Sequence, residues 1–309
     1  MTDLSIDLGF MKLKNPVIAA SGTFGYGVEF TPFINLNHLG GFVVKGLYYS
    51  PREGNPPPRL VETSSGLINA IGLQGIGVKR FSEEILPHLI DYDTSIIINV
   101  CGEHEDEYAA VVDLLNYQPG IAAYELNISC PNVMKDGKCP ALDPETTYSV
   151  VKLAKKSSTR PIITKLSPNV TDITEIAFSA QEAGTDAVSL VNTFLAMAID
   201  PNTRKPKLAN ILGGLSGPAI KPIALRMVYQ VAGRLTIPVI GMGGICTGGD
   251  ALEFLIAGAR AVEIGTANFI DPEATVKIIN ELDNFCQERK IDKLETIIGT
   301  MKQDIGKLT

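Results

Sequence analysis

A cysteine just beyond a short apolar run is the side chain best placed for acid–base or nucleophilic chemistry. The run closes in the segment Asn127 to Asn132, which contains Cys130 followed by Pro131. Proline restricts the backbone of the turn, and a thiol held there could act as a base or as a nucleophile. An unperturbed thiol has a pKa of about 8.5, so its surroundings must lower that value for it to work at neutral pH. The 3 histidines of the chain follow none of the apolar runs, which disfavours a Cys–His hydrolase.

Two glycine-containing segments are typical of a phosphate site. Gly241-Met242-Gly243-Gly244 closes one apolar run, and Gly265-Thr266 closes the next. Glycine lets the backbone approach an anion closely, and backbone N–H groups can then point at it. A G-x-G-G sequence alone is more often a tight turn. Its pairing with Gly-Thr at the end of the following run predicts a cofactor or substrate that carries phosphate.

Two lysines also stand at the ends of apolar runs. Lys45 and Lys165 could each stabilise negative charge on a bound group, as on the pyrimidine end of a reduced flavin. The alternative for either lysine is a side chain that extends from the rim of the fold into water.

A third type of chemistry is indicated by the segment Asn69-Ala70-Ile71-Gly72-Leu73. Its amide side chain and exposed backbone suit a ligand with several hydrogen-bonding edges. The alternative is an ordinary glycine turn that leads into a helix.

Eight apolar runs rich in β-branched residues must position these groups, and amphipathic stretches separate most of them. Continuous apolar strands that alternate with helices predict a parallel sheet covered on its faces, and eight units predict a closed (β/α)8 TIM barrel. The rival fold is an open doubly wound sheet. The predicted strands are Pro16–Ser21, Gly41–Gly46, Ser95–Val100, Tyr124–Ser129, Pro161–Ser167, Ala187–Thr193, Pro238–Gly244 and Ala261–Thr266. The predicted helices are 74–90, 103–117, 144–157, 172–183, 219–234, 248–258 and 273–289.

Three further segments complete the predicted architecture, which is one domain over residues 1–309. Leu4 to Lys14 predicts an N-terminal β-hairpin that plugs the bottom of the barrel. The connections Leu47 to Leu73 and Phe194 to Pro218 are longer than a turn requires, and both follow strand ends, so we expect them to rise over the mouth. The carboxyl ends of the strands together favour a ligand site there. They present Ser21, Lys45, Asn99, Asn127, Lys165, Asn192, Thr193, Gly243, Gly244, Gly265 and Thr266.

Composition excludes several classes of protein. The 309 residues carry a net charge of −7, so there is no basic surplus for a general nucleic-acid binder. The 5 cysteines include no C-x-x-C pair, so we expect no metal site and read them as reduced thiols of a cytoplasmic protein. Inert packing is the ordinary role of a cysteine outside a site, although Cys139 lies in a glycine-containing loop and its role stays open. Neither a signal peptide nor a membrane span is predicted.

Taken together, the motifs resemble those of dihydroorotate dehydrogenase, over nearly the whole chain and in the order of that family. Cysteine rather than serine at position 130 resembles class 1 of the family. Other stretches resemble subclass 1B, whose members use NAD through a separate subunit; they are Asn127 to Val133, Ala198 to Asp200, Leu208 to Asn210 and Gly213 to Pro218. The loop Met134 to Leu142, with Cys139 and Pro140, departs from the glycine- and aromatic-rich stretch expected there.

The resemblance implies that dihydroorotate is oxidised to orotate in the de novo synthesis of UMP. Cys130 would remove the proton from C5 while hydride leaves C6 for FMN. FMN would be held by Ser21, Lys45, Gly46, Asn99, Asn127, Lys165, Val191, Gly217, Gly243, Gly244, Gly265 and Thr266. The pyrimidine and its carboxylate would be held by Lys45, Asn69, Ala70, Ile71, Gly72, Leu73, Asn127, Asn132, Asn192 and Thr193.

A subclass 1B partner would be an iron–sulfur flavoprotein that carries FAD and a 2Fe-2S cluster, in a heterotetramer built on a homodimer of this chain. The fumarate-using homodimers of subclass 1A are an equally consistent alternative, because neither subclass needs a cysteine cluster in this chain. Two further alternatives are another flavin barrel that reduces pyrimidines and a non-catalytic barrel that binds a phosphate ligand.

Overall fold

The computed structural model describes residues 2–129 and 140–302, and eight of its strands form a closed parallel barrel. Around the barrel the strands follow chain order, and the last strand pairs with the first through Val262 and Val17. The predicted TIM barrel is therefore confirmed, and the open sheet is excluded. The barrel strands are β3 (Val17–Ala19), β4 (Gly41–Val43), β7 (Ser95–Val100), β8 (Ile121–Asn127), β9 (Ile162–Lys165), β10 (Ala187–Leu190), β15 (Val239–Met242) and β16 (Ala261–Ile264).

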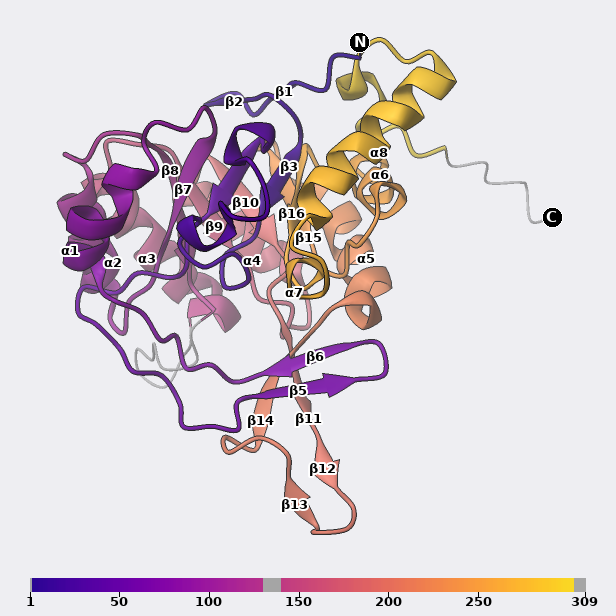
Figure 1. Cartoon of the computed structure of the whole chain (residues 1–309). Helices are drawn as coiled ribbons and strands as arrows, with labels where there is room; N and C mark the ends of the chain where they lie inside the picture. The colour runs from indigo at the N-terminus through magenta and orange to yellow at the C-terminus, as the bar shows by residue number, and fades with distance from the viewer. Residues whose placement is uncertain (1, 130–139, 303–309) are drawn as a thin grey trace.

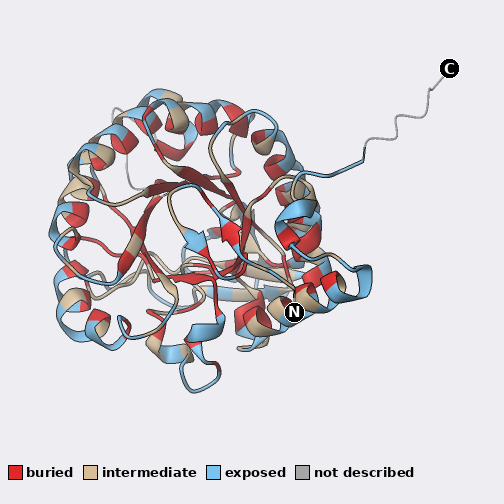
Figure 2. Ribbon diagram, turned by 90° about the horizontal axis from the view of Figure 1, so that it is seen from above, coloured by how far each residue is buried: buried red, intermediate tan, exposed pale blue. Residues whose placement is uncertain are grey.

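Helices surround the barrel as an outer ring whose buried faces turn inward (Figure 2). Most of them agree with the predicted ranges, because each carries an apolar stripe at helical spacing. The α-helices are α1 (Val78–Arg80), α2 (Glu105–Leu115), α3 (Pro144–Ser157), α4 (Ile173–Glu182), α5 (Lys221–Ala232), α6 (Gly248–Ile256), α7 (Ala267–Ile270) and α8 (Ala274–Arg289). The short 3-10 helices are η1 (Val28–Phe30), η2 (Leu36–His38), η4 (Leu86–His88), η5 (Pro140–Leu142), η6 (Pro218–Ile220) and η7 (Leu294–Ile297).

The helix predicted over 74–90 is shorter and irregular. Gly77 adopts φ +81°, so α1 begins only after it. A π-helical turn, η3 (Phe81–Ile85), and then η4 continue the element. Pro87 lies in the first turn of η4 and cannot donate a backbone hydrogen bond, which prevents regular α-helix there.

Two apolar layers hold the barrel together. The larger lies between the strands and the helices and contains residues such as Phe42, Tyr124 and Phe254. The smaller fills the barrel interior and includes Ile97 and Ile163. Two layers are required because successive side chains of each parallel strand point alternately to the helices and to the barrel interior.

The predicted N-terminal hairpin consists of β1 (Ile6–Asp7) and β2 (Lys12–Leu13), which pair antiparallel. Ile6, Leu8 and Leu13 join the interior apolar layer of the barrel, each with about 1% of its surface exposed. The hairpin lies at the end of the barrel opposite the long excursions (Figure 1). It therefore closes the bottom, as the sequence predicts.

The two long connections form a small antiparallel sheet at the other end of the barrel, beyond the strand ends (Figure 1). Its order is β11-β14-β6-β5, so strands from both connections lie side by side. Prediction from sequence identified the excursions but not these strands. They are β5 (Leu60–Thr63), β6 (Gly66–Asn69), β11 (Phe194–Met197) and β14 (Leu212–Ser216), and a hairpin of β12 (Ile199–Asp200) and β13 (Lys205–Pro206) extends from them.

Across the described ranges, no helix combines the length and the apolar character that crossing a membrane would require.

Candidate active site

The carboxyl ends of β7, β8 and β9 place three of the predicted polar residues together. Asn127 ends β8 and pairs in register with Lys165, which ends β9. Asn99 lies one residue before the end of β7, opposite Glu125 of β8. Because parallel strands of a barrel end at one rim, these side chains share the mouth that the excursion sheet covers.

The amides of Asn99 and Asn127 form a chain of contacts. The Asn127 amide nitrogen donates to Asn99 Oδ1 at 3.5 Å, and the Asn99 amide nitrogen donates to Glu125 Oε1 at 2.6 Å. Tyr108 fixes the backbone below by donating its hydroxyl to the Asn127 carbonyl at 3.0 Å. Asn127 Oδ1 and Ser129 Oγ are buried and have no hydrogen-bond partner among the described residues. Two orphaned polar atoms at a strand end are suited to a ligand that supplies donors.

Lys165 lies inside the barrel rather than extending into water. Its side chain is 6% exposed, and its Nζ lies 3.5 Å from Glu125 Oε1 and 3.7 Å from Glu263 Oε2. Burial alone lowers the pKa of Lys165, but the two carboxyl groups raise it more, so its net shift is upward. The residue is therefore a fixed positive charge at the mouth.

The predicted phosphate segments lie against each other. Gly243 and Gly244 adopt φ +125° and +74°, and a Cβ on Gly244 would come within 2.8 Å of the Gly217 carbonyl. Next to them, Thr266 donates its hydroxyl to Ser216 Oγ at 2.8 Å. Outside the regular elements, no hydrogen bond among the described residues uses the N–H groups of Gly243, Gly244, Gly265 or Thr266 as donors. This glycine-lined rim is suited to an anion such as a phosphate.

The excursion sheet brings together two of the predicted substrate residues. Asn69 of β6 donates its amide to the carbonyl of Gly214 in β14 at 3.2 Å. A Cβ on Gly214 would come within 2.0 Å of Thr193 Oγ1. Only glycine at position 214 therefore allows β14 to pass so close to Thr193, with Asn69 on its other edge.

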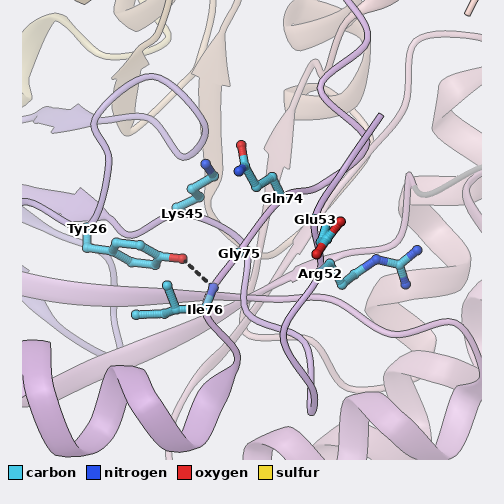
Figure 3. Close-up of a pocket in the computed structure, with 7 residues that line it drawn as sticks. All are labelled: Tyr26, Lys45, Arg52, Glu53, Gln74, Gly75 and Ile76. Carbon is cyan, nitrogen blue, oxygen red and sulfur yellow. Dashed lines mark hydrogen bonds between the residues drawn. The ribbon is translucent and has the colours of Figure 1, made fainter. Parts of the chain in front are cut away.

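A cavity of about 590 Å³ lies beside this site and shares only Lys45 with the predicted residues. Figure 3 shows Lys45 and Gln74 reaching into it and Tyr26 accepting a hydrogen bond from the Ile76 backbone at 3.1 Å. Burial, and then the charge of Arg59, lower the pKa of Lys45, while Glu29 opposes the shift. An anionic ligand beside Lys45 would favour its charged form, because the attraction offsets both the burial and the repulsion from Arg59. The cavity is lined by Tyr26, Lys45, Arg52, Glu53, Gln74, Gly75 and Ile76.

The remaining predicted residues lie on the same rim or on the segment that leads to it. Ser21 donates its hydroxyl to the Val44 carbonyl at 2.8 Å, and a Cβ on Gly46 would come within 2.7 Å of Cys101 Sγ. After β10, Val191 is buried and Asn192 Oδ1 accepts from the Thr193 backbone at 2.9 Å. Ala70 to Leu73 follow β6, with Gly72 and Leu73 both at positive φ.

Four residues singled out from the sequence lie outside the described residues. They are Cys130, Pro131, Asn132 and Cys139. The first described stretch ends one position before Cys130, at Ser129, which is two residues after the end of β8 at Asn127.

Sequence reasoning missed the acidic residues of the barrel interior. Glu125 and Glu263 lie within apolar runs and are fully buried, and Ser189 Oγ donates to Glu125 Oε2 at 2.8 Å. A charged residue in the middle of a buried strand was an available signal, since such a residue needs a partner. Arg59 and Gln74, whose side chains hydrogen bond at 2.7 Å, were also missed beside Lys45.

The donor set fits FMN at three places. The glycine-lined rim suits its phosphate, the buried ammonium of Lys165 suits the electron-rich pyrimidine end of its ring, and the orphaned Asn127 Oδ1 suits an N–H donor. No cluster of three or more potential metal-ligating side chains occurs within residues 2–129 and 140–302.

The chain is similar to known proteins over nearly its whole length. Residues 4–286 match the family model for dihydroorotate dehydrogenase. The catalytic subunit of dihydroorotate dehydrogenase B (NAD(+)) from Geobacter sulfurreducens is 50% identical over 97% of this chain and 98% of that protein. The corresponding subunit from Bacteroides thetaiotaomicron is 49% identical over 98% of this chain and 100% of that protein. A putative dihydroorotate dehydrogenase A (fumarate) from Solibacter usitatus is 55% identical over 94% of this chain and 95% of that protein.

Among solved structures, DHODH from Eimeria tenella in complex with ferulenol superposes with a TM-score of 0.78. The match covers 96% of this chain and 88% of that one at 22% identity, so it supports the fold.

Proposed function

Because the chain belongs to the dihydroorotate dehydrogenase family, we propose that its barrel mouth binds FMN and dihydroorotate side by side. The chain is an oxidoreductase that converts dihydroorotate to orotate in pyrimidine biosynthesis. The observation that carries the site assignment is the convergence of Lys165, the Asn99–Asn127 pair and the glycine-lined rim on one end of the barrel.

Bound FMN supplies the hydride acceptor for this oxidation. The chain's own residues orient the reactants and hold charge. Gly243, Gly244, Gly265 and Thr266 would hold the FMN phosphate through backbone N–H groups, and Lys165 would place a positive charge at the pyrimidine end of its ring. Ser21, Gly46, Asn99, Val191 and Gly217 complete the predicted FMN contacts.

The substrate is held by amides and by a lysine. Asn127, Asn132 and Asn192 offer donors and acceptors to the amide edges of the pyrimidine. Lys45, whose pKa is lowered by burial and by Arg59, pairs with the substrate carboxylate. The segment from Asn69 to Leu73 and Thr193 enclose the same ligand from the excursion sheet.

Cys130 acts as the general base in this proposal. Its thiolate would accept the proton from C5 and C6 would give up a hydride to the bound flavin, so that the C5–C6 double bond of orotate forms. The place of Cys130 in the sequence supports this role, because it follows by three residues the end of β8 at Asn127, which lies at the barrel mouth.

The electrons pass to NAD through a partner subunit, in keeping with relatives named as catalytic subunits of the NAD(+) enzyme. We propose that this partner is an iron–sulfur flavoprotein with FAD and a 2Fe-2S cluster, in a heterotetramer built on a homodimer. The Solibacter usitatus relative favours fumarate as the second candidate acceptor. A cytoplasmic location and a single domain over the 309 residues stay predictions.

One anaerobic experiment tests the reaction and then the acceptor. The purified FMN-loaded chain is reduced with dihydroorotate, and NAD or fumarate is then added with and without the candidate partner protein. We expect bleaching of the flavin by dihydroorotate and reoxidation by NAD only when the partner is present.

Two outcomes would contradict these proposals separately. An oxidised flavin that stays yellow with dihydroorotate would contradict the active site, whereas fumarate turnover by the isolated chain would contradict the NAD assignment alone.

A further inference from the structure

Three titratable side chains meet inside the barrel below the proposed cofactor site. Lys165 of β9 lies between Glu125 of β8 and Glu263 of β16. The side chains of Glu125 and Glu263 are 0% and 1% exposed. Two acids and one base in so apolar an interior are expected to interact strongly, because water screens none of them.

The two acids have different hydrogen-bonding environments. Glu125 accepts from Asn99 at 2.6 Å and from Ser189 at 2.8 Å, and its Oε1 lies 3.5 Å from Lys165 Nζ. Both Glu263 oxygens lack a hydrogen-bond partner in the described part of the chain, and Lys165 Nζ lies 3.7 Å from one of them. Glu125 has the donors that a buried carboxylate needs, whereas an ionised Glu263 would be buried without a hydrogen-bond donor, which is costly.

The surrounding strands supply no further charge. β3, β4 and β15 have the sequences VIA, GFV and VIGM, none of which titrates. The polar groups nearby are Asn99, Ser189 and the Cys101 thiol, which donates to Asn99 Oδ1 at 3.4 Å. With both acids ionised, the two carboxylates and the ammonium would carry one net negative charge. That charge would lie below the proposed cofactor site, where a reduced cofactor would also be negative.

We propose that Glu263 holds a proton and acts as a positioning residue, which leaves Lys165 and Glu125 as a neutral ion pair beneath the cofactor. Burial first, and then the neighbouring Glu125, raise the pKa of Glu263 well above its usual range, against the opposing effect of Lys165. The role toward the cofactor rests on the proposed function, but the protonation state does not.

The proton can be observed directly by infrared spectroscopy of the full-length chain. A protonated carboxylic acid has a carbonyl-stretch band separate from those of carboxylates, and surface acids are ionised at neutral pH. We expect this band in the wild-type protein at neutral pH, whether or not FMN is bound. Glu263→Gln, which has the shape of the neutral acid, should remove it, and the matched surface variant Glu288→Gln should keep it.

Three outcomes would overturn the proposal. The first is a wild-type protein that lacks the band at neutral pH. This measurement does not depend on whether any variant folds. The band could also survive Glu263→Gln, which would place the proton on another acid. Glu288→Gln could instead remove it, which would place the proton on the surface.

The reduction potential of bound FMN provides the second readout. Glu263→Gln should leave this potential unchanged at neutral pH, because it replaces one neutral group with another. A shift to a more positive potential would mean that a negative charge had been removed, and would overturn the proposal. Failure of dihydroorotate to bleach the flavin would contradict the proposed function instead, without affecting the infrared result.

Discussion

At the scale of single residues, the proposed chemistry depends on polar groups whose surroundings set their charge. Lys165 is held positive beside the buried carboxylate of Glu125, and Lys45 is held where burial and Arg59 lower its pKa. The strand-end positions of both lysines could be predicted, because apolar runs mark the strands. The partners of Lys165 could not, because Glu125 and Glu263 belong to distant strands that only barrel closure brings together.

Replacing Cys130 with alanine tests the proposed base. Without a thiolate, proton removal from C5 has no acceptor in place, so Cys130→Ala should slow flavin reduction about 100- to 10,000-fold. Stopped-flow absorbance under anaerobic single-turnover conditions measures that rate, and the variant should still bind FMN. Cys286→Ala is the control, because that cysteine is buried between helices and barrel away from the mouth. Unchanged reduction in Cys130→Ala would contradict the assignment.

The pH dependence of flavin reduction follows from the same assignment. Only the thiolate accepts a proton, so the rate should rise with pH and level off above the thiol pKa, which is about 8.5 when unperturbed. Single-turnover rates of the wild-type protein across that range provide the test. A profile that stays flat while proton removal limits the rate would argue against a thiol.

Replacing Lys165 with methionine tests the charge that it supplies. The methionine side chain keeps most of the volume but not the ammonium, so reduced FMN should lose affinity more than oxidised FMN does. The difference should be about 1.5–3 kcal/mol, the contribution of a hydrogen bond to a charged group. Binding titrations of both redox forms measure it, with the surface variant Lys277→Met as control. Equal losses for the two forms would rule out a charge-stabilising role.

At the scale of elements, two excursions that look like loops in the sequence form one antiparallel sheet. β6 pairs with β14 across a large separation in the chain, and Gly214 allows β14 to approach Thr193. The sequence predicts where the excursions start, because they follow barrel strands. It does not predict their pairing, since short exposed strands with glycine have little apolar alternation.

Substituting Gly214 with alanine tests this close approach. The added Cβ would lie 2.0 Å from Thr193 Oγ1, so β11 or β14 must shift and carry Thr193 and Asn69 with it. We expect the KM for dihydroorotate to rise roughly tenfold, equivalent to about 1.4 kcal/mol, with FMN still bound. Gly233→Ala is the matched control, because its Cβ would meet nothing closer than 3.5 Å. An unchanged KM in Gly214→Ala would show that the excursion sheet does not contribute to substrate binding.

At the scale of the whole molecule, the barrel divides stability and chemistry between its two ends. The N-terminal hairpin fills the bottom with apolar side chains, whereas the polar strand ends and the excursion sheet form the other end (Figure 1). This architecture was predictable because eight buried strands alternating with helices have few other solutions.

Replacing Leu13 with alanine should therefore reduce stability without altering the site. Leu13 is 1% exposed in the interior layer, so the truncation should cost about 2–5 kcal/mol of unfolding free energy. Urea unfolding followed by circular dichroism measures this loss, and Leu114→Ala, at a residue 45% exposed, should change it little. A Leu13→Ala protein with unchanged stability and impaired flavin binding would contradict this assignment of stability to the bottom of the barrel and of chemistry to its mouth.

The central claim is that FMN and substrate meet over the polar ends of the barrel strands, and a crystal structure of the chain with FMN and orotate tests it most directly. The account predicts the FMN phosphate at Gly243, Gly244, Gly265 and Thr266, its pyrimidine end at Lys165, and orotate against Asn127 and Asn192, with Cys130 facing C5. FMN bound elsewhere, or a sulfur at position 130 directed away from orotate, would contradict it.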